Sequence, residues 1–232
     1  MSSLYNELNY TENIKEIKGV QFGVLSPEEI KKRSVCHVTQ TVLYYNTSGE
    51  PVVNGLFDPR MGVIDHGKIC PTDNLDNRFC PGYFGHIELA RPVFHVQFIP
   101  IILKILKCIC IRCSKLLIDI NSPEIQSIIK NTQSKKRFNI ITERCSKIKI
   151  CGTECENGCG ALQPNKYVKE GLALIYAEWK DKSLENVNKE NNRQLLNAEF
   201  IQKIFKRITD EECEAIGLSA NWCRPEWLIC EV

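Results

Sequence analysis

The pattern of apolar and polar positions along this chain predicts several short helices separated by irregular segments. The clearest signal covers residues 98–108, where apolar side chains recur with the 3.6-residue period of a helix that buries one face. Comparable patterns predict helices at residues 123–130, 135–144 and 198–207. These helices supply apolar faces from which the chain can build a core.

Two further helices are marked by the residues at their starts. Ser26 stands three residues before Glu29, and such a pair satisfies free backbone donors at a helix start, so we predict a helix over residues 27–33. Thr209 is likewise followed by a glutamate three residues later and predicts a short helix that ends at Gly217. Both helices are predicted from their ends rather than from an apolar face.

Strands are expected where β-branched residues cluster, and loops where Gly, Pro, Asp and Asn cluster. These criteria predict strands at residues 17–24, 37–45, 87–89 and 171–179 and a turn at residues 46–51. Residues 55–83 carry almost no periodicity, and a loop of this length needs an anchor such as a metal or a partner. The charged stretch 180–193 is predicted to be an exposed loop. The mixture predicts an α+β fold that is irregular and rich in loops.

Composition narrows the class of protein. The chain has 232 residues, 43% of them hydrophobic, and a formal net charge of +2, so it should fold and any basic surface must be local. The first residues lack the apolar core of a signal peptide, and no apolar stretch is suited to span a membrane. The 13 cysteines are therefore expected to be reduced, in an intracellular compartment where thiolate metal sites form.

One pair of cysteines has the spacing of half a zinc site. Cys110 and Cys113 are separated by two residues, which places both sulfur atoms on one tight turn. Because no histidine follows residue 95, the remaining ligands must come from Cys145, Cys151, Cys155 and Cys159. A four-cysteine site would be structural, with no open position for hydrolytic chemistry. The alternative is a set of buried free cysteines.

An earlier group of metal-ligand residues is incomplete. Cys70 and Cys80 are spaced like half of a zinc site, but Asp73 and Tyr83 stand where the other two ligands are expected. A carboxylate can bind zinc, whereas a neutral phenol is a poor ligand. The histidines available as substitutes are His66 and His86. The alternative is a pair of reduced cysteines in a loop that other contacts hold in place.

No catalytic centre emerges from the sequence. It has no phosphate-binding glycine loop, no G-x-S-x-G motif and no H-E-x-x-H motif. The basic run Lys135, Lys136 and Arg137 stands beside an aromatic residue and is compatible with contact to a nucleic-acid backbone. A solvated helix face explains the same run equally well.

The order of several local motifs resembles one protein family. The segments are VQFGVLSPEEIKKRSV at 20–35, GLFDPRMGVID at 55–65, CPGYFGHIELARPVFHVQFI at 80–99, CIRCSKLL at 110–117, SKKRF at 134–138, GCGALQP at 158–164 and RPEWLI at 224–229. In this order they are similar to the N-terminus of the largest subunit of multisubunit DNA-directed RNA polymerases, of the RNA polymerase II type. The resemblance covers nearly the whole chain.

The resemblance implies two zinc sites. The first falls on Cys70, Asp73, Cys80 and Tyr83, so residues 66–86 would be a degenerate zinc region in which two of the four ligands are replaced. The second falls on Cys110, Cys113, Cys151 and Cys159, within a zinc-binding clamp head at residues 108–165. The loop between the last two cysteines is shorter than the family pattern, and Cys155 inside it could compete as a ligand.

The resemblance also implies a role and its partners. Residues 1–232 would form a clamp segment that holds template DNA and the RNA–DNA hybrid, in contact with the other polymerase subunits and especially the second-largest. The family's magnesium-binding motif NADFDGD is absent from the chain, so magnesium and nucleotide addition would belong to the complete enzyme. The compartment would be the nucleus for a cellular enzyme, and the host cytoplasm or the virion for a viral one.

Other hypotheses remain open on the sequence alone. A free-standing zinc-binding interaction module, such as a ubiquitin-ligase adaptor, would also need a C-x2-C pair. A short product that modulates a host polymerase is a third hypothesis. The chain stops directly after the apolar run 227–230, which suggests a fragment or a split gene product.

Overall fold

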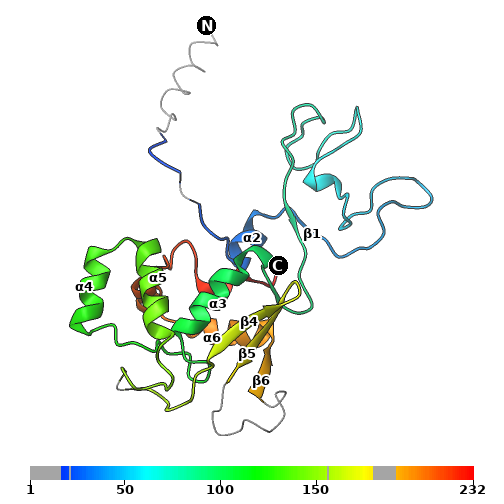
Figure 1. Cartoon of the computed structure of the whole chain (residues 1–232). Helices are drawn as coiled ribbons and strands as arrows, with labels where there is room; N and C mark the ends of the chain where they lie inside the picture. The colour runs from blue at the N-terminus through cyan, green and yellow to red at the C-terminus, as the bar shows by residue number, and fades with distance from the viewer. Residues whose placement is uncertain (1–16, 21, 156, 180–191) are drawn as a thin grey trace.

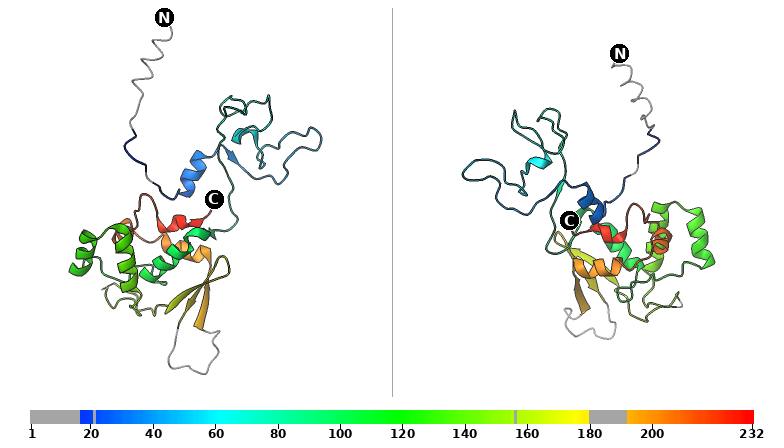
Figure 2. Two further views of the ribbon diagram at one scale, coloured as in Figure 1. Left: turned by 45° about the horizontal axis from the view of Figure 1, so that its top comes forward. Right: turned by 180° about the vertical axis from the view of Figure 1, so that it is seen from behind.

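The computed structural model describes residues 17–20, 22–155, 157–179 and 192–232, which form a helical body and an arm of loops (Figure 1). The body holds nearly all of the regular structure. The arm, residues 38–84, projects away from the body in each of the views (Figure 2). The predicted α+β class, with short strands and much irregular chain, is confirmed. Among the described residues, no helix is long and apolar enough to cross a membrane.

Helix α3 (Ile99–Cys108) is the centre of the body. Its residues Ile99, Ile102, Ile105 and Leu106 are fully buried, which confirms the helix predicted from the apolar period. Burial of each such side chain contributes roughly 1.5–3 kcal/mol relative to exposure. The helix contacts a second helix on one side and a strand of the main sheet on another, so it ties both layers of the body together.

The main sheet is antiparallel and has three strands in the order β4–β5–β6. Their bounds are Lys166–Glu170, Leu174–Glu178 and Arg193–Leu196. In the central strand Ile175 and Ala177 are completely buried, while their neighbours along the strand are not. This alternation is the pattern of a sheet with one face on a core and the other toward solvent.

Four more helices belong to the body. They are α4 (Pro123–Asn131), α5 (Ser134–Cys145), α6 (Ala198–Phe205) and α7 (Asp210–Ile216). Of these, α5 packs against α3 while α7 packs against α5. Thr209 and Glu212 form the predicted capping box of α7, and the helix ends at Gly217 in the left-handed conformation. The predicted helices are thus present, with bounds that differ by one or two residues.

The N-terminal and C-terminal parts of the described chain meet on the body. Helix α2 (Pro27–Arg33) has the predicted capping box of Ser26 and Glu29. Just before it, the Val24 N–H donates to the Trp222 carbonyl at 2.7 Å. The short strand β3 (Val93–Phe94) pairs with β7 (Ile229–Cys230).

The described chain also contains short 3-10 helices: η1 (Pro59–Met61), η2 (Val96–Phe98) and η4 (Pro225–Leu228).

The arm is anchored to the body by strand β1 (Cys36–His37), which pairs in parallel with β2 (Gly85–His86). Inside the arm, the buried Asp58 carboxylate accepts hydrogen bonds from the Asn54 backbone N–H at 2.6 Å and from the Arg60 backbone and side chain. The Arg60 guanidinium holds the pKa of Asp58 far below its usual range, although burial opposes this. An ion pair with several hydrogen bonds therefore fixes a loop that has almost no apolar core.

Several predicted strands are wrong in position or length. The described residues of 17–24 form no strand, and Ile17, Val20 and Phe22 remain 82%, 76% and 92% exposed. Over residues 37–45 the only strand is the end of β1, with an isolated bridge at Tyr44. β-branched composition alone does not make a strand: among the described residues, 17–24 pairs with no strand, and beyond β1 the segment 38–45 has only the single bridge from Tyr44 to Pro51.

The remaining strands lie at positions other than those predicted. The segment predicted at 87–89 follows β2, and of the predicted 171–179 only β5 is extended. Strands β4 and β6 were not predicted, because their polar residues hide the alternation. The exposed loop predicted at 180–193 lies outside the described residues up to 191, and Arg193 already belongs to β6.

Candidate metal centre

The cysteines of the second predicted site meet in one cluster. The Sγ atoms of Cys110, Cys113, Cys151 and Cys159 all lie within 4.8 Å of one another. The Cys110 and Cys159 sulfur atoms are 3.6 Å apart, and those of Cys113 and Cys151 are 3.7 Å apart. Four thiolates at about 2.3 Å from one zinc ion lie about 3.8 Å from each other, so the cluster has the dimensions of a tetrahedral zinc site.

Two tight turns present these sulfur atoms. The first follows α3, where the Cys110 N–H donates to the Lys115 carbonyl at 2.8 Å and Ser114 adopts a φ of 65°. The second is closed by the Cys151 N–H, which donates to the Ala161 carbonyl at 3.0 Å. Each turn therefore holds two ligands without help from a long regular element.

Glycine is required in the second turn. A Cβ atom on Gly158 would lie 2.1 Å from the Cα of Gly152, a distance that no side chain can occupy. Gly160, on the other side of Cys159, has a φ of 69°. The glycines that flank Cys159 in the sequence thus permit the close backbone approach and the reversal that bring its sulfur to the cluster.

Hydrogen-bond donors surround the Cys110 sulfur. The Arg112 N–H donates to it at 3.4 Å, and the Gln163 side-chain amide donates through Nε2 at 3.2 Å. The same Gln163 side chain accepts from the Ile111 N–H through Oε1 at 3.2 Å. Donors stabilise a thiolate, the form that binds metal. Gln163 was not predicted; its only sequence signal is its place in the GCGALQP segment.

The thiols differ in how readily they ionise. Burial raises the pKa of Cys110 and of Cys151, whereas the backbone N–H of Ala161 lowers the pKa of the exposed Cys159 to about 7. Cys159 is therefore the thiol of this cluster that ionises more readily than the buried Cys110 and Cys151. Metal binding must release protons from the buried thiols, so zinc affinity should fall as the pH is lowered.

Two cysteines that the sequence left open as ligands lie elsewhere. Cys155 points its sulfur at the carbonyl oxygens of Leu116 and Ile118, at 3.7 and 4.0 Å. Cys145 is buried in the body, where its thiol is hydrogen-bonded to Cys108. Neither belongs to the four-sulfur cluster.

The first predicted group also comes together, but with different contacts. The sulfur atoms of Cys70 and Cys80 and a carboxylate oxygen of Asp73 lie within 4.8 Å of one another. The Tyr83 hydroxyl donates to Asp73 Oδ2 at 3.1 Å, and the Leu75 N–H donates to Asp73 Oδ1 at 2.9 Å. Asp73 is thus the centre of this group, with donors on both of its oxygens.

The two histidines considered as substitutes do not join the first group. His66 contacts the Asn77 side-chain amide at 3.0 Å through Nδ1, and His86 contacts the Ser34 hydroxyl at 2.7 Å. His86 instead lies with His37 and Glu88 in a third group, which was not predicted. There the two imidazole rings are stacked at 4.6 Å with 5° between their planes, so their in-plane lone pairs cannot converge on one ion in this arrangement.

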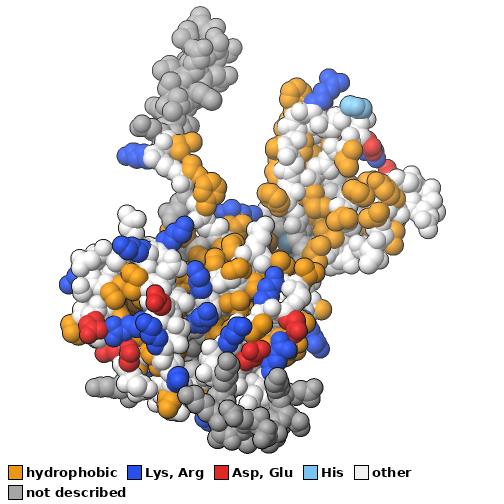
Figure 3. Space-filling model, in the orientation of Figure 1, with side chains coloured by type: hydrophobic (Ala, Val, Ile, Leu, Met, Phe, Trp, Pro, Cys, Tyr) orange, Lys and Arg blue, Asp and Glu red, His pale blue; other side chains and the backbone are white. Residues whose placement is uncertain are grey.

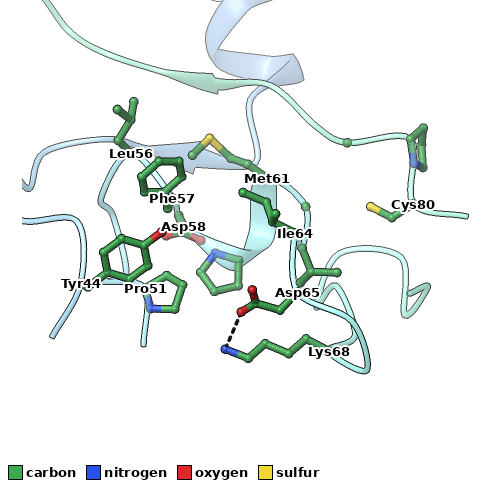
Figure 4. A pocket seen from close by; sticks show the side chains of 15 residues that line it. Tyr44, Pro51, Leu56, Phe57, Asp58, Met61, Ile64, Asp65, Lys68 and Cys80 are labelled. Carbon is green, nitrogen blue, oxygen red and sulfur yellow. Dashed lines mark ion pairs between the residues drawn. The ribbon is translucent and has the colours of Figure 1, made fainter. Parts of the chain in front are cut away.

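Beside the first group, the arm contains a cavity of about 400 Å³ (Figure 4). Tyr44, Pro51 and Phe57 line one part of it, and Cys80 lies at its edge. An ion pair between Asp65 and Lys68, 3.2 Å long, borders the opening. The Cys80 side of the first group is therefore open to small solutes.

The basic run divides into two kinds of residue. Lys135 and Lys136 are exposed on the first turn of α5. Arg137 is half-buried, and its Nη1 donates to the Ile129 carbonyl at 3.1 Å, near the end of α4. Figure 3 shows Lys and Arg side chains spread over the face of the body that carries α3 and α5. Lys135 and Lys136 are free to meet a phosphate backbone, whereas Arg137 joins two helices.

Comparison with known families identifies the chain. The family described as RNA polymerase Rpb1, domain 1, matches residues 14–232. The chain belongs to this family. It is thereby related to the N-terminal region of the largest subunit of DNA-directed RNA polymerase, a nucleotidyltransferase, which confirms the resemblance of the ordered motifs. In this Rpb1 domain 1 member, the residues expected at the second zinc site bring four sulfur atoms together, whereas those expected at the first bring together two sulfur atoms and the Asp73 carboxylate, to which Tyr83 is hydrogen-bonded.

Proposed function

We propose that this chain is the clamp segment of an RNA polymerase largest subunit, and that it helps to hold template DNA and the RNA–DNA hybrid during transcription. The observation that carries the proposal is the family match over residues 14–232. The other subunits, the second-largest above all, would be its partners. The domain that we assign as clamp head is residues 108–165.

The four-cysteine cluster would hold one structural zinc ion. Its four positions would all be filled by protein, so the ion would brace the fold and take no part in the chemistry. Cys110 and Cys113 follow α3, the buried centre of the body, while Cys151 and Cys159 precede the main sheet. Zinc would therefore join α3 and the main sheet, the two layers of the body, at one end.

Nucleic acid would be held by charge rather than by sequence. Lys135 and Lys136 stand exposed at the start of α5, and neither forms an ion pair with another described residue. Contacts of this kind position a protein on phosphates and weaken as salt rises. Magnesium and nucleotide addition would be supplied by the rest of the enzyme. The compartment would be intracellular and reducing: the nucleus, or the host cytoplasm or virion for a viral enzyme.

The proposal is tested by assembly. The chain, carrying an affinity tag, is expressed with the remaining polymerase subunits, and the purified complex is analysed by mass spectrometry and by transcription from a tailed template. We expect the chain in stoichiometric amount in an active complex. A fully active complex that excludes the chain would refute the clamp role.

A further inference from the structure

We infer that Cys70, Asp73, Cys80 and Tyr83 form a metal-free, hydrogen-bonded cluster in which the Asp73 carboxylate takes the central place that a metal ion would have. The cluster would fix the same loop of the arm without zinc. The inference concerns these residues alone and does not rest on the clamp role.

The first argument is the arrangement of donors around Asp73. Its two oxygens already accept hydrogen bonds from the Tyr83 hydroxyl and the Leu75 N–H, at 3.1 and 2.9 Å. The sulfur atoms of Cys70 and Cys80 lie within 4.8 Å of a carboxylate oxygen of Asp73. A central anion surrounded by protonated donors is the reverse of a central cation surrounded by thiolates.

The second argument is the contrast with Cys110. That sulfur receives N–H donors from Arg112 and Gln163, at 3.4 and 3.2 Å. The Cys70 sulfur instead lies near two carbonyl oxygens, those of Pro59 and Arg60, at 3.6 and 4.0 Å. Carbonyl oxygens repel a thiolate and accept from a thiol, so the neighbours of the Cys70 sulfur do not favour a bond from it to zinc.

The third argument is that other hydrogen bonds hold the loop around Cys70, Asp73, Cys80 and Tyr83 in place without a metal. The Cys70 N–H donates to the Leu75 carbonyl at 2.9 Å, and the Thr72 hydroxyl donates to the Arg60 carbonyl at 2.6 Å. The Tyr83 N–H donates to the Met61 carbonyl at 2.8 Å. These bonds join the segment to the turn at η1, so the loop has an anchor of its own.

Zinc content provides the first test. The metal in the purified full-length chain is measured by inductively coupled plasma mass spectrometry after growth in zinc-supplemented medium. We expect one zinc per chain, lost in Cys113→Ser and kept in the matched variant Cys80→Ser. Two zinc ions, with one lost in Cys80→Ser, would overturn the metal-free cluster. Absence of zinc from the wild type would refute the zinc of the clamp head and leave the metal-free cluster standing.

Restoring the ligands gives the converse test. The double variant Asp73→Cys with Tyr83→His removes the central carboxylate and the phenol and supplies four zinc ligands. We expect a second zinc ion per chain. If the double variant stays at one zinc, then these two side chains are not what excludes the metal, and the inference fails.

Amide hydrogen exchange supplies a readout that does not depend on metal analysis. Adding a chelator to the wild type should speed exchange at residues 109–116 and 150–162 and leave residues 69–83 unchanged. Tyr83→Phe should speed exchange at residues 69–83, because one donor to Asp73 is lost, whereas the exposed control Tyr45→Phe should not. Chelator-induced exchange at residues 69–83 in the wild type would overturn the inference.

Discussion

At the scale of single residues, the polarity of the nearest hydrogen-bonding atoms distinguishes the two cysteine groups. Cys110 has N–H groups within reach of its sulfur, and Cys70 has carbonyl oxygens. Both cysteines are fully buried, so burial does not separate them. The sequence predicted which residues belong to each group. The Arg112 N–H lies on the same turn as Cys110, but the Gln163 donor and the acceptors of η1 are farther away in the chain and were not predicted.

Gln163 should act as a positioning residue for the candidate zinc site. Gln163→Leu keeps the volume similar but removes the donor to Cys110, and loss of such a contact typically costs 10–100-fold in metal affinity. We expect the zinc affinity of the variant, measured by competition with a chromogenic chelator, to be about 10-fold lower than that of the wild type. The control Gln40→Leu, at an exposed position, should behave as the wild type. Equal zinc retention in both variants would refute the role of Gln163.

Asp58 should stabilise the arm in a pH-dependent way. Asp58→Asn removes the charge that Arg60 pairs with, and hydrogen bonds to charged groups contribute about 2 kcal/mol. We expect the amides of Asn54 and Arg60, both of which donate to Asp58, to lose about that much protection against exchange at pH 7.

The sign of this effect follows from the lowered pKa of Asp58. A carboxyl whose folded-state pKa is depressed stabilises the fold above its unfolded pKa of about 3.9 and loses that contribution as the pH falls through the folded pKa. The difference between wild type and variant should therefore shrink below about pH 4. Asp65→Asn is the control, since that side chain is 65% exposed and its ion pair should contribute little. A difference that grows at low pH would contradict this account.

At the scale of elements, the close contact between α5 and the end of α7 leaves no room for a side chain at Gly217. Gly217 has a φ of 102°, and a Cβ there would lie 2.5 Å from the Ser134 carbonyl oxygen. Gly217→Ala should destabilise the chain more than Gly171→Ala, which has a φ of 57° but open space around it. We expect a cost of about 1 kcal/mol for Gly171→Ala and at least about 2 for Gly217→Ala, because the second adds a clash to the strain. Urea-induced unfolding measures both, and equal costs would show that the contact is not restrictive.

Helices were predicted well and strands poorly for one physical reason. The period that buries Ile102 and Ile105 is local, and the capping bonds of Ser26 and Thr209 span three residues, so both signals lie within a short stretch of sequence. A strand is stabilised by a partner that the sequence does not name. Strand β6 is formed largely by its pairing with β5, and its mostly exposed residues carry no apolar pattern of their own.

At the scale of the whole molecule, the charge is nearly balanced, so any affinity for nucleic acid must come from a local surface. The formal net charge of +2 does not favour binding by itself. Figure 3 shows many Lys and Arg side chains on the face of the body with α3 and α5, and fewer Asp and Glu side chains between them. The arm carries mainly apolar and uncharged surface in the same view. Contact with phosphates is therefore expected at the body rather than at the arm.

The slope of affinity against salt tests this expectation. In the assembled complex, Lys135→Ala with Lys136→Ala should weaken binding to a DNA–RNA scaffold and lower the slope of log K against log salt by up to about 2, since each duplex phosphate contact contributes about 0.9. The control pair Lys166→Ala with Lys169→Ala removes the same charge from exposed positions on β4. The salt slopes of both double variants are measured by fluorescence anisotropy between about 50 and 300 mM KCl, roughly the range in which phosphate contacts weaken. If both pairs reduce the slope equally, the effect belongs to the net charge of the molecule, and α5 has no special place at the nucleic acid.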